Sequence, residues 1–136
     1  MKNWAGNLTY GALEVLKPTS VDELRAIVKA TPRVRPLGSR HSFNRIADTP
    51  AVQVSVSELP DVFRIDGSTV TVGAGVRYGE MVGRLDEAGW ALHNLASLPH
   101  ISIAGAVATG THGSGDRNGS LATAVAALRL VNADGE

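Results

Sequence analysis

The chain has 136 residues, of which 43% are hydrophobic, and its 13 basic and 13 acidic side chains leave no net charge. This length suits one domain with a buried core, and the charge balance excludes the cationic surplus that drives nonspecific binding to nucleic acid. The absence of cysteine excludes disulfides, thiolate catalysis and sulfur-ligated metals.

No apolar run approaches the roughly 20 residues that a membrane span requires, and the first residues lack the apolar stretch of a signal peptide. We therefore expect a cytoplasmic protein whose partners include neither nucleic acid nor a membrane. The 15 glycines are clustered, which indicates places where the backbone approaches a ligand closely.

Hydrophobic periodicity and turn residues predict short strands that alternate with two helices. Ser20 and Glu23 form a capping box for the first helix, and Gly89 can cap the second in a left-handed conformation. Gly67 can take the positive φ of a hairpin turn. In chain order we expect a strand over residues 14–17, a helix over 21–30, strands over 34–37 and 52–56, a hairpin of 62–65 with 69–72, a helix over 78–88 and a strand over 125–132. The helices should bury Val21, Leu24, Ile27 and Val28, and Tyr78, Met81, Val82 and Leu85.

The last predicted strand is followed by a turn at Ala133-Asp134-Gly135, which should lead into a hairpin partner. Only Glu136 follows this turn. We therefore expect the chain to be a fragment of a longer protein.

Two segments consist of small and polar residues. Residues 38–43 follow a predicted strand, and residues 97–115 contain no acidic side chain and nothing large beyond aliphatic residues and two histidines. Backbone N–H groups and hydroxyls in such segments can bind a pyrophosphate without lysine. The alternative is that the small residues only permit tight packing, and we favour the phosphate interpretation for the two segments taken together.

A third glycine cluster, Gly73 to Gly79, stands between a predicted strand and a predicted helix, as a dinucleotide-binding fingerprint would. Its third glycine comes one place late, and residues 95–99, where a carboxylate should bind the ribose, contain no acidic residue. We interpret these glycines as a structural turn rather than an NAD site.

The histidines at positions 41, 93, 100 and 112 lack the spacing and the acidic neighbours of a metal site, so we expect no metal. His41 differs from the others because it follows Gly38-Ser39-Arg40 at the end of a predicted strand and directly precedes Ser42. It is therefore the strongest candidate for chemistry.

Three ordered motifs now make the chain resemble a known family. Asn3-Trp4-Ala5-Gly6-Asn7, the segment from Gly38 to Asn44, and the segment from Ser97 to Gly115 are similar to those of the alditol and xylitol oxidases, which belong to the vanillyl-alcohol oxidase superfamily together with the sugar-lactone oxidases. The resemblance implies an α+β FAD-binding domain of the PCMH type, with two small α/β subdomains and mixed sheets. The subdomains would span about residues 1–56 and 57–136, with the substrate domain absent.

The same resemblance implies that the cofactor is FAD, linked covalently from its 8α-methyl group to the imidazole of His41. His112 is the alternative attachment site, and Ser97 would also lie near the substrate. Relatives often carry glycine where Arg40 stands, which is the main departure from the family pattern. The residues implied to contact FAD are Gly38, Ser39, Arg40, His41, Ser42 and Phe43 in the first segment, and Ser97, Ser102, Gly105, Ala106, Thr109, Gly110, His112, Gly113 and Ser114 in the second.

The implied activity of the intact enzyme is oxidation of a polyol such as xylitol or sorbitol, by hydride transfer to FAD with oxygen as the acceptor and hydrogen peroxide as a product. The segment Ser97 to Ser102 favours a polyol oxidase over the lactone branch. A sugar-1,4-lactone oxidase, a flavin dehydrogenase and a non-catalytic flavin-binding fragment stay open as alternatives. We expect no catalytic residue in this chain, because the residues that assist the reaction would belong to the substrate domain.

Overall fold

The computed structural model describes all of residues 1–136, which divide into two compact units. Unit 1 comprises residues 1–60 and 129–136, and unit 2 comprises residues 61–128. The sequence-based division near residue 57 left the final residues in the second part, whereas the structure groups residues 129–136 with the first. None of the helices combines the length and the apolar character needed to cross a membrane.

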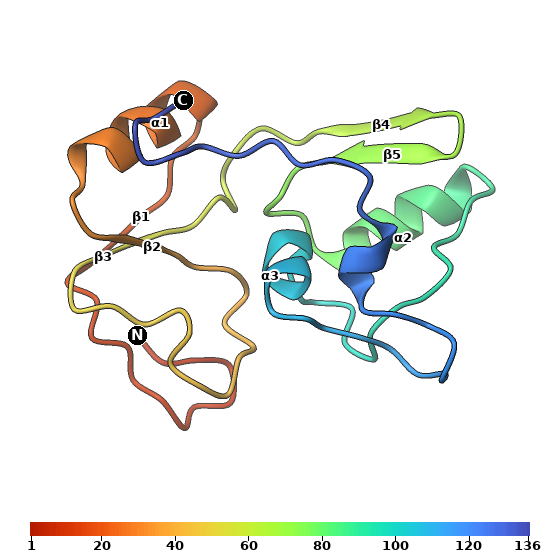
Figure 1. Cartoon of the computed structure of the whole chain (residues 1–136), viewed down its shortest axis with the longest axis horizontal. Coiled ribbons are helices and arrows are strands. Elements are labelled where there is room, and N and C mark those ends of the chain that lie inside the picture. The colour runs from red at the N-terminus through yellow and green to blue at the C-terminus, as the bar shows by residue number, and fades with distance from the viewer. The chain divides into compact units, whose positions relative to one another are not determined.

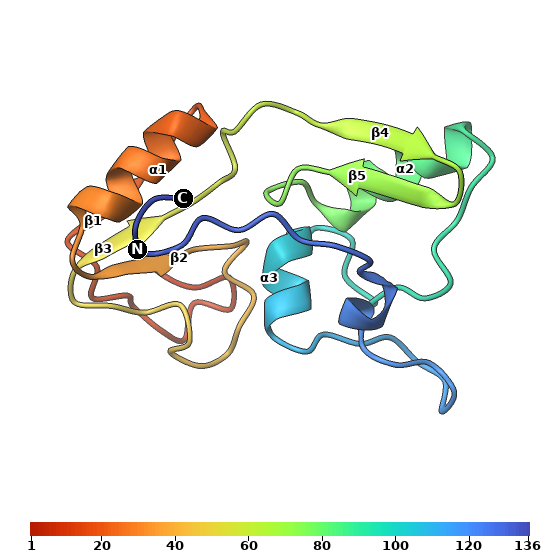
Figure 2. The same ribbon diagram turned by 45° about the horizontal axis from the view of Figure 1, so that its top comes forward.

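Unit 1 is built on a parallel sheet of three short strands, β1 (Glu14–Leu16), β2 (Val34–Pro36) and β3 (Val52–Val54). The order is β1-β3-β2, so β3 is central and pairs in parallel with both neighbours. Parallel strands cannot be joined by a tight hairpin. Helix α1 (Val21–Ala30), which lies beside the sheet in Figures 1 and 2, and the loop over residues 37–51 make the connections.

The first helix begins where the sequence predicts. The Ser20 hydroxyl accepts a hydrogen bond from the Glu23 N–H (3.1 Å), and the Glu23 carboxylate accepts one from the Thr19 N–H (2.7 Å). These bonds satisfy donors that the first helical turn leaves without partners. The apolar residues expected to be buried, Val21, Leu24, Ile27 and Val28, are only partly buried.

The interior of unit 1 contains polar as well as apolar side chains. Gln53, in the central strand, is fully buried (0% exposed), and its amide nitrogen donates to the carbonyl of Ala47. Hydrogen bonds to such side chains can therefore fix loops that pass over the sheet. The buried residues of this unit include Asn3, Tyr10, Leu37, Thr49, Gln53, Val54 and Ser55.

Residues 1–11 form a short N-terminal hairpin that the sequence did not predict. Lys2 and Thr9 form an isolated antiparallel bridge, and Gly6 takes a φ of +75° in the turn. The Asn3 N–H donates to the Leu8 carbonyl (3.0 Å) inside this hairpin. We refer to residues 1–11 as the N-terminal hairpin below.

Unit 2 combines an antiparallel pair, β4 (Phe63–Asp66) and β5 (Thr69–Val72), with helix α2 (Tyr78–Glu87), a short helix α3 (Ile103–Ala108) and a 3₁₀ turn η1 (Leu121–Ala124). The hairpin turn is confirmed, with Gly67 at φ +57°. Helix α2 packs against the hairpin, because its buried residues cluster with the partly buried side chains of β4 and β5. The core of the unit is Tyr78, Met81, Leu85, Ile101, Ala106 and Leu121.

Two features of the fold differ from the prediction. Residues 125–132 form no strand, since no neighbouring strand accepts their hydrogen bonds, and Leu128 and Leu130 are mostly exposed. The turn after them is present, with Gly135 at φ +77°. The structure is α+β as expected, but each sheet is of one type, parallel in unit 1 and antiparallel in unit 2, rather than mixed.

Candidate cofactor-binding site

The loop that carries His41 leaves the sheet at the end of β2. Leu37 is buried, and its N–H still donates to the Val54 carbonyl (2.8 Å), so the loop starts from a fixed point. Arg40 then takes a φ of +67° and is the one non-glycine residue of the chain with a positive φ. This left-handed conformation costs energy for an L-residue with a side chain but not for glycine.

Two neighbours contact the His41 ring from different directions. Nδ1 of the imidazole lies 3.0 Å from the Ser39 hydroxyl oxygen. The indole of Trp4 stacks on the imidazole face, with ring centroids 5.0 Å apart and ring planes inclined by 26°. A hydrogen bond in the ring plane and a contact on the ring face together restrict both the tilt and the rotation of the imidazole.

Three consecutive residues of the N-terminal hairpin hold the His41 loop. The Trp4 N–H donates to the Arg40 carbonyl (2.9 Å), and the Arg40 guanidinium donates to the Lys2 carbonyl (3.1 Å). Between them, the buried amide of Asn3 donates to the Ser42 carbonyl (3.1 Å). The loop is therefore fixed by contacts with residues almost forty positions earlier in the chain.

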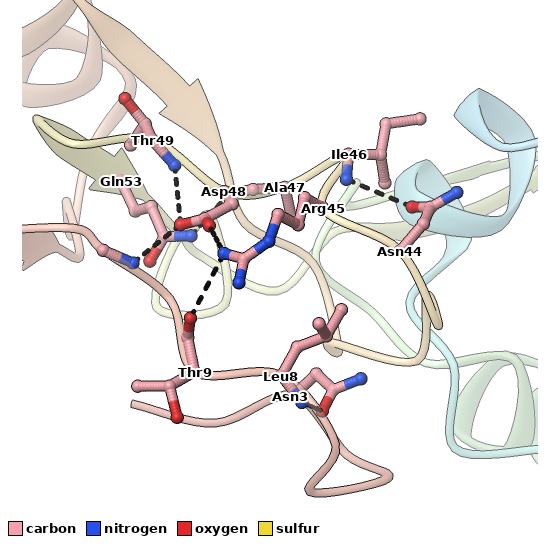
Figure 3. A network of polar contacts seen from close by, with 11 residues as sticks. Asn3, Leu8, Thr9, Asn44, Arg45, Ile46, Ala47, Asp48, Thr49 and Gln53 are labelled. Carbon is pink, nitrogen blue, oxygen red and sulfur yellow. Dashed lines mark hydrogen bonds and ion pairs between the residues drawn. The ribbon is translucent and has the colours of Figure 1, made fainter.

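A second set of polar contacts anchors the chain after His41 (Figure 3). The Asp48 carboxylate accepts hydrogen bonds from the N–H groups of Gly11 (2.7 Å) and Thr49 (2.9 Å) and pairs with Arg45, which also reaches the Thr9 carbonyl. The Gly11 N–H, with the donors from Arg45 and Thr49, holds the pKa of Asp48 below its usual value, against the effect of desolvation. The N-terminal hairpin therefore bonds to the loop both near His41 and near Asp48.

In unit 2, the segment expected to be a loop contains helix α3. Ser102 is the N-cap residue and is buried, while Thr109 is the C-cap residue and donates from its hydroxyl to the Gly105 carbonyl (2.8 Å). Ala106 is buried in the core of the unit. Its side chain therefore packs inward, and this packing explains why a small residue stands at position 106.

Gly110 and Gly113 also have local structural reasons. Gly110 follows the C-cap with a φ of +66°, and the next N–H, of Thr111, donates to the Ala106 carbonyl (3.1 Å), as in a Schellman motif. At Gly113, a Cβ would lie 2.1 Å from the Leu95 carbonyl oxygen. A side chain at either position would strain the fold whether or not a ligand is present.

Other predicted residues of this segment are accessible. Ser97, Thr109, His112 and Ser114 are exposed. His112 Nδ1 lies 2.8 Å from the Gly113 carbonyl oxygen, so this nitrogen carries the proton when the contact is a hydrogen bond. The accessible hydroxyls are thus better candidates for ligand contact than the buried alanine or the two glycines.

The rejected NAD fingerprint is confirmed as a structural turn. Residues 73–77 connect β5 to α2, and the Val76 N–H donates to the Gly73 carbonyl (3.1 Å). The preceding strand belongs to an antiparallel pair, whereas a dinucleotide fingerprint belongs to a parallel βαβ unit. At Gly79, a Cβ would lie 3.2 Å from Pro99 atoms, so close packing accounts for this glycine.

The residues of both segments fit FAD chemically. Neither 38–43 nor 97–115 contains a carboxylate, and their hydroxyls and backbone N–H groups suit an anionic pyrophosphate. In unit 1, Phe43, two residues after His41 in the chain, is 68% exposed. An exposed aromatic side chain so close to His41 in sequence suits a planar, largely apolar ring system.

Sequence reasoning gave Asn3 and Trp4 no role beyond membership of a motif. Asn3 is only 4% exposed and bonds to Ser42, and Trp4 stacks on His41. One signal for Trp4 was present in the sequence. It is a large aromatic residue in a polar stretch that has neither helix nor strand periodicity, so it has no neighbouring apolar residues with which to form a core. Its partner could not be inferred from spacing.

Known proteins match almost the whole of this chain. Residues 12–136 match a family model described as an FAD binding domain. The chain is 49% identical to an alditol oxidase of Streptomyces sp., over 98% of this chain and 33% of that protein. It is 36% identical to an L-gulono-1,4-lactone dehydrogenase of Mycobacterium tuberculosis, over 98% of this chain and 33% of that protein.

Among solved structures, cholesterol oxidase from Brevibacterium sterolicum matches 82% of this chain and 23% of its own length, with a TM-score of 0.69 at 19% identity. This identity supports a common fold and nothing finer. The chain spans about a third of the length of the curated relatives it matches. It belongs to the FAD-binding domains of the vanillyl-alcohol oxidase superfamily, with the PCMH-type fold.

Proposed function

We propose that this chain is the FAD-binding portion of an oxidase that acts on polyols of the xylitol and sorbitol type, with FAD covalently attached at His41. When bound, FAD supplies the acceptor for a hydride from a carbinol carbon and then passes the electrons to oxygen, which gives hydrogen peroxide. The chain's own residues bind the cofactor and orient it. We also propose that the protein acts in the cytoplasm.

The observation that carries this proposal is the setting of His41. Its ring lies in the loop after β2 and contacts Ser39 and Trp4, and the exposed Phe43 follows two residues later in the chain. A nucleophilic side chain held by a hydrogen bond and a stacked ring is prepared for a single direction of attack. The 49% identity to an alditol oxidase supports the choice of a polyol as substrate.

Each unit carries residues that are proposed to contact FAD. In unit 1, the backbone and hydroxyls of residues 38–43 surround His41. In unit 2, the exposed hydroxyls of Ser97 and Ser114 are the proposed donors, and Ser97 also contacts the substrate. Thr109 is proposed to contact FAD without donating to it, because its hydroxyl already donates to the Gly105 carbonyl. Ala106, Gly110 and Gly113 shape the segment rather than supply a functional group.

Acid precipitation of the full natural chain tests the covalent link. Yellow flavin should stay with the precipitated protein and should pass to the supernatant in the His41→Ala variant. His112→Ala is the matched control and should retain the flavin. Free flavin from the unaltered protein would refute a covalent link, and retention in His41→Ala with loss in His112→Ala would move the link to His112.

A lactone-oxidising enzyme is the second candidate, favoured by the 36% identity to a lactone dehydrogenase. The full natural chain should release hydrogen peroxide with xylitol or sorbitol and not with a sugar-1,4-lactone. Peroxide with the lactone alone would select the lactone oxidase, and reduction of a dye without peroxide would select a dehydrogenase.

The isolated chain of residues 1–136 is the third candidate, a flavin-binding fragment without turnover. The chain covers about a third of its relatives, and we propose that groups assisting removal of the hydroxyl proton lie outside these residues. Residues 1–136 alone should then produce no peroxide under conditions where the full natural chain does. Turnover by the isolated residues would refute this division of labour.

A further inference from the structure

Trp4 is poorly explained by the folding of unit 1. Its side chain is 54% exposed, so its removal would open no cavity in the core. The side chain of the neighbouring Asn3 is buried and bonds to Asn7 and Leu8 within the hairpin and to Ser42 in the loop. Trp4 bonds to the loop through its backbone N–H, which any residue at this position would supply, so its indole ring is what needs an explanation.

The Trp4 ring lies on the face of the one side chain proposed to react. A centroid separation of 5.0 Å and an angle of 26° place the two π systems in stacking contact. Ser39 contacts the same imidazole through Nδ1 at 3.0 Å. Together they limit rotation about the Cβ–Cγ bond of His41, so the ring nitrogens keep fixed directions.

We propose that Trp4 is a positioning residue for covalent flavin attachment: its indole holds the plane of the His41 imidazole and favours positive charge on that ring. This inference rests on the proposed function, since it concerns the link at His41. The match to the general FAD-domain model begins at residue 12. The residue that we assign thus lies outside the part of the chain matched by that model.

The chemistry of attachment explains why a ring face matters. A bond forms between an imidazole nitrogen and the 8α carbon of FAD, one proton leaves that carbon and one leaves the imidazole, and two electrons pass to dioxygen, which becomes hydrogen peroxide. The imidazole carries positive charge after the bond forms and before its proton leaves. An indole face within about 6 Å stabilises such a cation, and tryptophan does so better than phenylalanine.

Trp4 itself gives no proton and no electron in this scheme. Its removal should therefore slow the attachment and leave the amount of FAD that binds unchanged. A residue that only stabilised the fold would instead lower FAD binding and thermal stability together. These two patterns separate a positioning role from a structural one.

The test compares Trp4→Leu and Trp4→Phe with Trp90→Leu, a matched control that removes the other tryptophan, in unit 2 and 46% exposed. Apoprotein of the full natural chain, from riboflavin-starved cells, is mixed with FAD. Bound flavin is measured after gel filtration, and attached flavin is measured in acid precipitates over time. Thermal melting of each apoprotein checks the fold.

Trp4→Leu should bind FAD as the unaltered protein does but attach it about tenfold more slowly, with Trp4→Phe intermediate and Trp90→Leu unchanged. Equal attachment rates for Trp4→Leu and the unaltered protein would overturn the role of Trp4 alone. Loss of FAD binding in both Trp4 variants would also overturn it, in favour of a binding role. Absence of acid-stable flavin from the unaltered protein, or its presence in His41→Ala, would overturn the proposed attachment site and this inference together.

Discussion

The two units hold their candidate segments in different ways. In unit 1, the His41 loop is tied by hydrogen bonds to the N-terminal hairpin, through the buried amide of Asn3 and the carboxylate of Asp48. In unit 2, the segment of residues 97–115 is fixed by an apolar core that includes Ile101 and Ala106, and by glycines at points of close approach.

This difference determines whether a unit can fix the orientation of a side chain or only the path of the backbone. Hydrogen bonds are directional, so they can set the orientation of one side chain such as His41. Apolar packing is not directional, and it fixes a backbone path mainly by excluding other paths. His41, the residue proposed to react, accordingly belongs to unit 1, and the accessible hydroxyls of Ser97, Thr109 and Ser114 belong to unit 2.

The largest expected effect is in the apolar core. Leu85 is 4% exposed in helix α2, and Leu85→Ala should lower the free energy of unfolding of unit 2 by about 2–5 kcal/mol, because the cavity forfeits both transfer energy and contacts. Hydrogen exchange followed peptide by peptide should place the loss in residues 61–128. Leu13→Ala, at an 85% exposed position in unit 1, is the control and should change little.

Asn3→Ala should be the most damaging change to the polar arrangement. It leaves the Leu8 N–H and the Ser42 carbonyl without the Asn3 side chain and should cost about 1–3 kcal/mol, with faster hydrogen exchange in unit 1. Asn7→Ala removes only the acceptor of one bond from Asn3 and is the milder control. Equal effects of the two variants would mean that burial of Asn3 contributes nothing.

Arg40→Gly should test the strained turn. At a φ of +67°, glycine avoids the cost that a Cβ imposes, so Arg40→Gly should be more stable than Arg40→Ala by roughly 1 kcal/mol in chemical denaturation. Both variants lose the guanidinium bond to the Lys2 carbonyl, so the difference between their stabilities measures the cost of a Cβ in the left-handed conformation. A more stable alanine variant would show that the turn is not left-handed in solution.

Removal of the Asp48 charge should give the smallest effect, and one that depends on pH. The folded pKa lies below the ordinary 3.8, so the carboxylate contributes its full stability above that value and loses it as the pH falls through the folded pKa. Asp48→Asn should therefore lower the melting temperature at neutral pH, with the difference shrinking as the pH falls below 3.8 and through the folded pKa. Glu58→Gln, which breaks an exposed pair with Lys17, should change melting little.

Local patterns in the sequence predicted the regular elements of the fold. Helix α1 begins and ends where the capping box and apolar spacing indicate, and β5 spans the predicted residues 69–72. The predicted strand over residues 125–132 was wrong because a run of apolar residues does not show whether a partner strand is present. Helix α3 was missed because its small residues lack an amphipathic pattern.

The site was predictable only where its signal is local. His41 stands out because of its immediate neighbours, whereas its contact with Trp4 joins residues far apart in sequence. The sequence likewise does not show why residue 113 is glycine, because the group that a Cβ at this position would meet is the Leu95 carbonyl. Polar side chains such as Asn3 reveal their partners only in the folded chain.

The return of residues 129–136 to unit 1 bears on the order of folding. The Arg25 side chain donates to the Gly135 carbonyl (2.8 Å), and a Cβ at Gly135 would meet the Arg25 carbonyl at 2.8 Å. Unit 2 is therefore an uninterrupted insertion within the sequence of unit 1. During synthesis, unit 1 can therefore form its last contacts, including the bond from Arg25 to Gly135, only after residues 61–128 have been made.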